Sequence, residues 1–208
     1  PPYATSLHNL GNLYSEIGAY DKAERLFLQV EAIDAKAFGG NPPADSLSSR
    51  AFLYLQAGAY DKAEPLLLKA LELITRNAGH DPSSHASILN LLAELYRELG
   101  AYEKAEPLFR QALQVAEGAF GRNHPDYADC LTGLAGLYVM TGAFEKAEPL
   151  YLEAREIFAQ TLGEDHPAYA RSLANAADLY LAMKKQAAAI PLIRETNQIH
   201  RTLLERIM

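Results

Sequence analysis

The sequence predicts an all-α fold, a right-handed α-α superhelix of five helix-turn-helix hairpins with about ten helices. Two observations lead to this prediction. The segment Gly18–Glu24 returns in nearly the same form at Gly58, Gly100 and Gly142, so the glycines are 40, 42 and 42 residues apart. A tyrosine also stands four residues before each of these glycines. Internal repetition at such a period is typical of stacked helical repeats.

Each repeat is expected to contain two helices joined at the glycine. Upstream of Gly18, apolar residues recur at helical spacing and form one stripe. Gly18 is then expected to end the first helix, because glycine tolerates the left-handed conformation that commonly closes a helix. Downstream, a second apolar stripe begins at Ala23, a small residue that lets paired helices approach closely. The two stripes comprise Leu7, Leu10, Leu13, Tyr14 and Ile17, then Ala23, Leu26, Phe27, Val30 and Ile33.

The repeats are expected to form one array over residues 1–208. Their approximate bounds are 1–40, 41–82, 83–124, 125–166 and 167–208. The fifth repeat is degenerate, because Lys184 replaces the glycine, Gln186 the aromatic residue and Ile190 the glutamate of the repeated segment. Its second helix stays apolar to the end of the chain through Ile193, Leu203 and Ile207. Terminal repeats usually have a polar cap, so this end is predicted to contact a further helix or a neighbouring domain.

These residues resemble the tetratricopeptide repeat, whose pattern is filled in the first unit by Leu10, Gly11, Tyr14, Gly18, Tyr20, Ala23 and Phe27. The usual unit has about 34 residues. The longer unit here, with K-A-E-P-L and G-x-x-H-P segments, is similar to the kinesin-light-chain type. Similar arrays are common in bacterial signalling proteins, often beside a caspase-like protease domain or a nucleotide-binding switch domain. The resemblance implies binding of a protein or peptide in a concave groove lined by the first helices.

The expected groove residues lie on one face of the first helix of each repeat. Asparagine both donates and accepts hydrogen bonds, so four asparagines among them could hold the backbone of an extended peptide; equally, they could be solvated helix positions. With no lysine and only two arginines, the groove is not expected to clamp a terminal carboxylate. Small and apolar residues of its second half could admit an apolar anchor, or could let helices pack closely. The candidate binding residues are His8, Asn9, Asn12, Phe52, Asn90, Glu94, Arg97, Met140, Arg171, Asn175 and Asp178.

Composition narrows the class of partner. A net charge of −7 argues against nucleic acid and against an anionic membrane surface. No apolar stretch is long enough to span a bilayer. The single cysteine, Cys130, excludes an internal disulfide framework and fits a reducing compartment such as the cytoplasm. The expected partner is therefore a protein or peptide.

We expect no enzymatic activity, no metal and no cofactor, because no catalytic constellation is found in the sequence. His124 and His166 share one loop position, but they lie a full repeat apart. We therefore expect them to cap helices or shape loops rather than to bind metal. Cys130 is expected to be a small packing residue. The alternative to groove binding is a regulatory or assembly module, which packs on an attached effector domain, such as a caspase-like protease, or self-associates through its C-terminal end.

Overall fold

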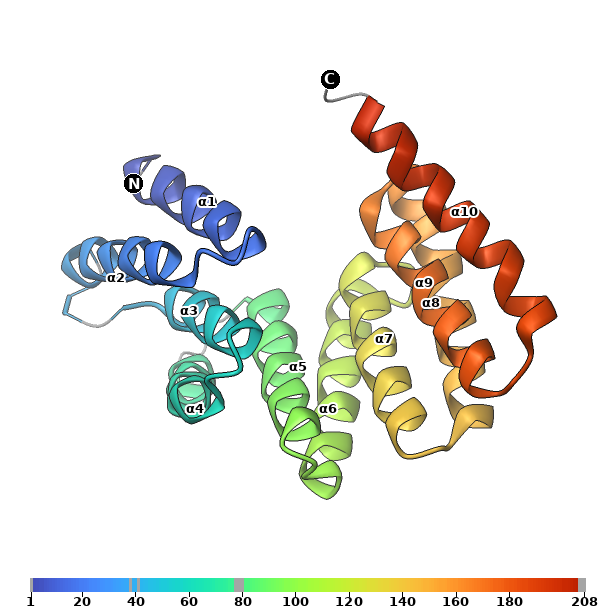
Figure 1. The fold of residues 1–208 in the computed structure, drawn as a ribbon. Helices are drawn as coiled ribbons and strands as arrows, with labels where there is room; N and C mark the ends of the chain where they lie inside the picture. Colours follow the sequence, from blue (N-terminus) through green and yellow to red (C-terminus); the bar gives the residue numbers. More distant parts are fainter. Residues whose placement is uncertain (1, 38, 41, 77–80, 206–208) are drawn as a thin grey trace. The chain divides into compact units, whose positions relative to one another are not determined.

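The computed structural model describes residues 2–37, 39–40, 42–76 and 81–205. Within them it contains ten α-helices and no strand (Figure 1). The predicted all-α fold class is confirmed. The helices are α1 Pro2–Glu16, α2 Tyr20–Ala37, α3 Ala44–Gln56, α4 Tyr60–Arg76, α5 Pro82–Glu98, α6 Tyr102–Phe120, α7 Pro125–Met140, α8 Phe144–Leu162, α9 Pro167–Ala182 and α10 Gln186–Glu205.

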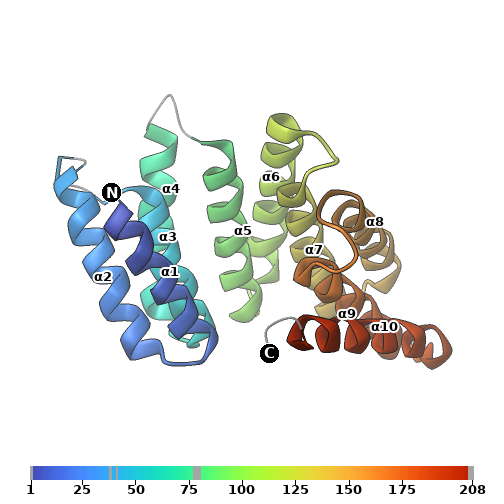
Figure 2. The ribbon, with the colours of Figure 1, turned by 90° about the horizontal axis from the view of Figure 1, so that it is seen from above.

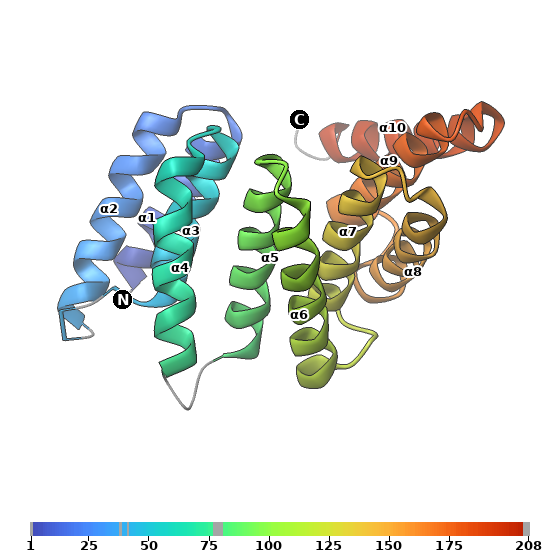
Figure 3. The same ribbon diagram turned by 90° about the horizontal axis from the view of Figure 1, so that it is seen from below.

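The chain divides into two compact units, Pro1–Ala101 and Tyr102–Met208. In the first unit, α1 pairs with α2 and α3 with α4, and α3 and α4 both contact α5 (Figures 1 and 2). In the second unit, α7 pairs with α8 and α9 with α10, while α6 contacts α7 and α8 contacts α9 (Figures 1 and 3). We call α1, α3, α5, α7 and α9 the A helices and the other five the B helices. A single array over residues 1–208 stays a prediction.

The turn from an A helix to its B helix has one geometry throughout. Gly18 adopts φ +73°, and its N–H donates to the carbonyl oxygen of Ser15 at 3.0 Å. The next N–H, of Ala19, donates to the carbonyl oxygen of Tyr14 at 2.8 Å. These two bonds form a Schellman motif, which satisfies carbonyl groups at the end of the helix. The same pair of bonds recurs at Gly58, Gly100 and Gly142, where φ is +69°, +72° and +75°.

Small and large apolar residues alternate in the interior of the hairpins. Ala23, at the start of α2, is fully buried, and so is the alanine at the matching place in each other B helix. Phe27, one turn further on, packs with Ala23 and with Leu53 of α3. This small-and-large pairing fills the space between helices at the density of a protein interior. The buried alanines of the other B helices are Ala63, Ala105, Ala147 and Ala189.

A tyrosine of each later A helix bonds to a glutamate of the preceding repeat, and a lysine of its own hairpin lies over the ring. The Tyr96 hydroxyl of α5 donates to Glu64 of α4 at 2.9 Å. The matching bonds join Tyr54 to Glu24, Tyr138 to Glu106 at 2.9 Å and Tyr180 to Glu148 at 2.9 Å. Within a hairpin, a lysine also lies over the tyrosine ring, at 5.2–5.3 Å from the centroid in three hairpins: Lys22 over Tyr14, Lys62 over Tyr54 and Lys146 over Tyr138. Such a cation–π contact is attractive.

The degenerate fifth repeat keeps this turn geometry without the glycine. Lys184 adopts φ +59°, the left-handed conformation that glycine has in the other repeats. The N–H of Lys185 donates to the carbonyl oxygen of Tyr180 at 2.8 Å, which completes the same motif. The Lys185 ammonium group lies 5.8 Å from the Tyr180 ring centroid and 3.7 Å from Glu148. Lys185 therefore takes over the role that the repeated lysine has elsewhere.

Three A helices, α5, α7 and α9, begin with a side-chain cap, whereas α3 begins after Pro43 without one. His124 Nδ1 accepts from the N–H of Asp126 at 3.2 Å, and His166 Nδ1 accepts from the N–H of Ala168 at 3.1 Å. Asp81 caps α5 in the same place, directly before the proline that opens the helix. The prediction that the two histidines cap helices is confirmed. No helix of the described part of the chain is long and apolar enough to cross a membrane.

Candidate peptide-binding faces

In the first unit the candidate residues lie on α1, α3 and α5. Asn9 and Asn12 of α1 are exposed, and Phe52 of α3 is 42% exposed although it is aromatic. His8 is half-buried, with its ring edge-on to Phe27 of α2 at a centroid distance of 5.5 Å. We define face 1 as the candidate residues Asn9, Asn12, Phe52, Asn90, Glu94 and Arg97 of these three A helices.

Three polar residues of α5, Asn90, Glu94 and Arg97, form side-chain hydrogen bonds within the helix. Asn90 Nδ2 donates to Glu94 at 3.1 Å, which is one helical turn away. Its Oδ1 atom is buried and has no hydrogen-bond partner among the described residues. Arg97 donates to Glu98 at 2.9 Å, so its charge is balanced locally. The Asn90 amide is therefore directed at Glu94, and its carbonyl oxygen is not accessible from the surface.

In the second unit, a charged pair joins α7 to α9. Arg171 donates to Asp129 at 2.9 Å. The two residues occupy the same position of successive repeats, 42 residues apart. Loss of hydration between the helices raises the pKa of the Asp129 carboxyl, and Arg171 opposes that rise. Because Asp129 neutralises Arg171, the second of the two groove arginines is also paired within the chain.

Apolar side chains are exposed near the opposite, C-terminal ends of α7 and α9. Met140 at the end of α7 is 51% exposed, and Leu181 at the end of α9 is 45% exposed. Between them in sequence, Asn175 is half-buried and Asp178 is exposed. Gly133 is buried and Gly136 half-buried, as close packing of α7 requires. We define face 2 as Met140, Arg171, Asn175, Asp178 and Leu181.

The candidate residues thus fall on two A-helix faces, one in each unit. His8 differs from the others because its ring contacts the B helix of its own hairpin. The pairs Arg97–Glu98 and Asp129–Arg171 were not predicted from the sequence. Opposite charges at one repeat position are a signal for the second pair. The tyrosine–glutamate bonds between repeats were not predicted either, although both residues recur in fixed register.

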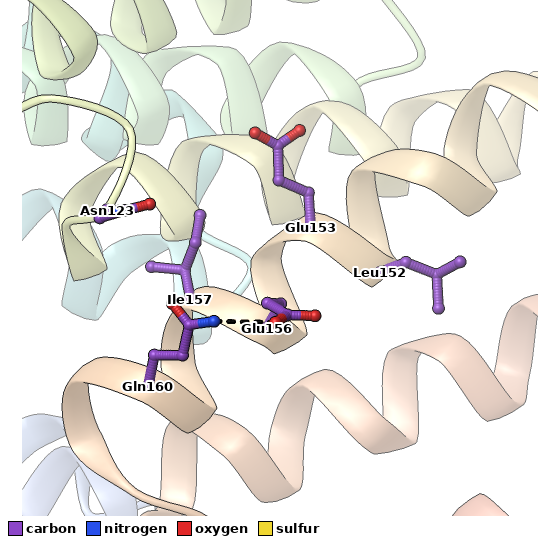
Figure 4. Close-up of a pocket in the computed structure, with 6 residues that line it drawn as sticks. All are labelled: Asn123, Leu152, Glu153, Glu156, Ile157 and Gln160. Atoms are coloured by element: carbon purple, nitrogen blue, oxygen red, sulfur yellow. Dashed lines mark hydrogen bonds between the residues drawn. The ribbon is translucent and has the colours of Figure 1, made fainter.

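A shallow depression of about 380 Å³ lies on α8 and the loop before α7 (Figure 4). It is lined by Asn123, Leu152, Glu153, Glu156, Ile157 and Gln160. Its polar groups already have partners within the chain: Glu153 pairs with Arg122 at 3.3 Å, and Gln160 donates to Glu156 at 2.8 Å. This depression therefore offers a ligand fewer open groups than faces 1 and 2.

No three residues of the metal-binding types His, Cys, Asp and Glu gather at one point in the described part of the chain. Cys130 is buried inside α7, as expected for a packing residue. His124 stacks on Phe120 with ring centroids 4.5 Å apart. The side chains of faces 1 and 2 offer amide, carboxylate and apolar contacts, which are the groups that recognise a polypeptide.

Comparison with known families agrees with this geometry. One tetratricopeptide-repeat model matches residues 84–158 and 142–199, and a second matches residues 4–43 and 44–84. The chain therefore belongs to the tetratricopeptide-repeat family. The predicted resemblance to this family is confirmed. No curated protein sequence gives a significant match to the chain.

Among solved structures, the chain is similar to BtubC (BKLC) from P. vanneervenii. The two are 25% identical with a TM-score of 0.69, over 89% of this chain and 72% of that one. A putative kinesin light chain from Podosopora anserina, with nearly identical TPR-like repeats, is 25% identical with a TM-score of 0.65, over 96% and 95% of the two chains. The fold is also shared with NprR in complex with its cognate peptide NprX, at 18% identity and a TM-score of 0.74, over 96% of this chain and 56% of NprR. These likenesses support kinesin-light-chain-like repeats.

Proposed function

We propose that this chain is a protein-interaction scaffold that binds a peptide or an extended protein segment on its A-helix faces. The observation that supports it most is the exposure of Phe52 and Met140, which are 42% and 51% exposed on A helices. Burial of such side chains in a pocket or against a ligand typically dominates binding energy. The structural neighbour NprR was solved with a peptide bound, which is consistent with this use of the fold.

The side chains of the two faces favour an uncharged ligand segment with an apolar anchor. Both arginines are paired with carboxylates of the same chain, so neither is a free cation for an acidic ligand. Asn90 already donates to Glu94 within α5. Exposed Asn9 and Asn12 can bond to peptide groups in both directions. We infer recognition of an extended backbone plus one or two large apolar side chains, without a carboxylate clamp.

The test is selection of a binding peptide from a random library, followed by titration of that peptide against variants. For a peptide that binds face 1, Phe52→Ala should weaken binding by about tenfold or more, and for a peptide that binds face 2, Met140→Ala should do the same. Leu28→Ala and Leu68→Ala are matched controls, because these B-helix side chains are 44% and 46% exposed. They should leave the affinity unchanged. Equal loss in the controls, or no loss in the A-helix variants, would place the binding site elsewhere.

A second candidate function is assembly through the C-terminal helix. Ile190, Ile193 and Leu204 of α10 are exposed large apolar residues. A surface of this kind can pack on an attached effector domain or on another copy of the chain. Under this function Ile193→Glu should abolish the assembly and leave peptide binding intact.

A further inference from the structure

The outer face of α1 repeats the surface that the later A helices bury against the preceding B helix. Leu13 is 53% exposed, whereas the leucines at the same repeat position are at most 1% exposed. Leu10 is 40% exposed, whereas Leu92 and Leu134 are at most 3% exposed. Tyr3 also lies on α1 and is 65% exposed, and Ile17, directly after the end of the helix, is 67% exposed. The buried counterparts of Leu13 are Leu53, Leu95, Leu137 and Leu179.

The outer face of α10 is the reciprocal surface. Ile193 is 38% exposed, but the large residues at the same position of the other B helices are at most 6% exposed. Those residues are covered by the A helix that follows, as Phe27 is covered by Leu53. Together, α1 and α10 carry six of the fourteen exposed large apolar side chains of the described residues. The counterparts of Ile193 are Phe27, Leu67, Phe109 and Tyr151.

We propose that α10 of one copy docks on α1 of a second copy in the register that joins consecutive repeats within the chain. This proposal rests on the second candidate function above, assembly through α10, and names a second copy as the partner and its α1 helix as the contact surface. In that register, Ile193 meets Leu13 as Phe27 meets Leu53. Asn197 meets Leu10, in the place where the buried ion pair Glu31–Arg50 joins the first two repeats at 2.8 Å.

The charges and polarities of the facing residues are compatible with α10 of one copy packing on α1 of another. The internal interfaces place a glutamate of the B helix against a tyrosine of the A helix in all four cases. On α10 and α1 the corresponding residues are Ile190 and Tyr14, and the Tyr14 hydroxyl has no hydrogen-bond partner among the described residues. None of the three facing pairs brings like charges together, and two of them are wholly or largely apolar. A heterologous contact of this kind does not close on itself, so copies add in a row.

The test uses sedimentation of the 208-residue chain from low micromolar to several hundred micromolar concentration. Wild-type protein should grow in mass with concentration beyond twice 22.8 kDa. Leu13→Glu and Ile193→Glu should each reduce it to monomers, while the matched control Leu28→Glu, on an exposed B-helix site, should not. An equimolar mixture of Leu13→Glu and Ile193→Glu should form a dimer, because each variant keeps the face that the other has lost. Circular dichroism confirms that each variant remains folded.

A gain of affinity tests the register itself. Ile190→Glu supplies the carboxylate that the four internal interfaces have, and it should tighten association by about fivefold to tenfold through a charge-assisted bond from Tyr14. Adding Tyr14→Phe to the Ile190→Glu variant should remove this gain in affinity. Association by unspecific apolar contact would instead weaken when Ile190 becomes charged, which would overturn the proposal.

The remaining outcomes separate this proposal from the function on which it rests. A wild-type monomer at every concentration overturns both the docking and self-assembly through α10. Loss of association in Ile193→Glu but not in Leu13→Glu supports assembly through α10 and overturns docking on α1. A mixture of the two variants that stays monomeric overturns the head-to-tail arrangement, because in that mixture one intact α10 face and one intact α1 face are available to each other.

Discussion

At the scale of single residues, Lys184 shows what the lost glycine costs. A residue with a Cβ atom in the left-handed conformation is about 1–2 kcal/mol less stable than glycine there. Lys184 nevertheless adopts φ +59°, because the Schellman bonds of the turn require it. The sequence comparison of repeats placed Lys184 at the glycine position but could not tell whether the turn would change shape.

Lys184→Gly should therefore stabilise the protein by about 1 kcal/mol. The measurement is the urea midpoint followed by circular dichroism. The reverse change, Gly142→Lys, is the matched control and should cost a similar amount, since Gly142 has φ +75° in the same turn of the preceding repeat. A lower urea midpoint for Lys184→Gly would show that Lys184 does not adopt the left-handed conformation.

The bond between Tyr96 and Glu64 tests the link between repeats. Tyr96→Phe removes a 2.9 Å hydrogen bond to a carboxylate and should cost about 1 kcal/mol of unfolding free energy. Tyr14→Phe is the matched control, because Tyr14 holds the same repeat position but has no such acceptor among the described residues. Denaturation at a protein concentration where the chain is monomeric should show a loss for Tyr96→Phe only; equal losses would mean that the bond contributes nothing.

At the scale of helices, the histidine caps of α7 and α9 explain a repeated sequence feature. Each imidazole Nδ1 atom accepts from the N–H two residues on, in a loop where Asp81 does the same with its carboxylate. A histidine cap requires an unprotonated Nδ1 atom. Recurrence of the histidine before proline is therefore explained by helix initiation, without a ligand.

His166→Ala should cost about 0.5–2 kcal/mol, the usual range for loss of an N-cap. His166→Asn should restore most of that loss, because asparagine is a strong N-cap. Thermal denaturation at neutral pH of the three proteins checks this ranking. Identical midpoints for His166→Ala and wild type would show that the loop, rather than the cap, begins α9.

The sequence predicted most of the fold because repetition supplies independent evidence for each element. One alanine position, one glycine position and one tyrosine position, each seen several times, were enough to place the helices and turns. The candidate faces were less predictable. Helical periodicity identifies which residues share a face, but the pairs Asn90–Glu94 and Asp129–Arg171 depend on side-chain rotamers and on the distance between helices. Both pairs reduce the number of groups open to a ligand.

At the scale of the whole molecule, stability is the sum of hairpins and of the interfaces between them. The same tyrosine–glutamate bond occurs in four such interfaces, so any condition that breaks it acts at all four. Burial and the adjacent carboxylate raise the pKa of Tyr54 to about 12. They raise the pKa of Tyr96, Tyr138 and Tyr180 in the same direction. The four tyrosines thus share one response to alkaline pH.

The sign of that response follows from proton binding. An unfolded tyrosine has a pKa of about 10, so between pH 10 and 12 the folded chain holds more protons than the unfolded chain. Stability is therefore complete below about pH 10 and falls as pH rises through the pKa values of the folded state. Urea midpoints measured from pH 8 to 12, with absorbance of tyrosinate recorded in parallel, should show both effects together. The chain with all four tyrosines changed to phenylalanine should begin less stable at pH 8 and lose less between pH 10 and 12. If its alkaline slope equals that of wild type, other groups control the transition, such as Tyr127 and Tyr169, whose pKa values burial also raises.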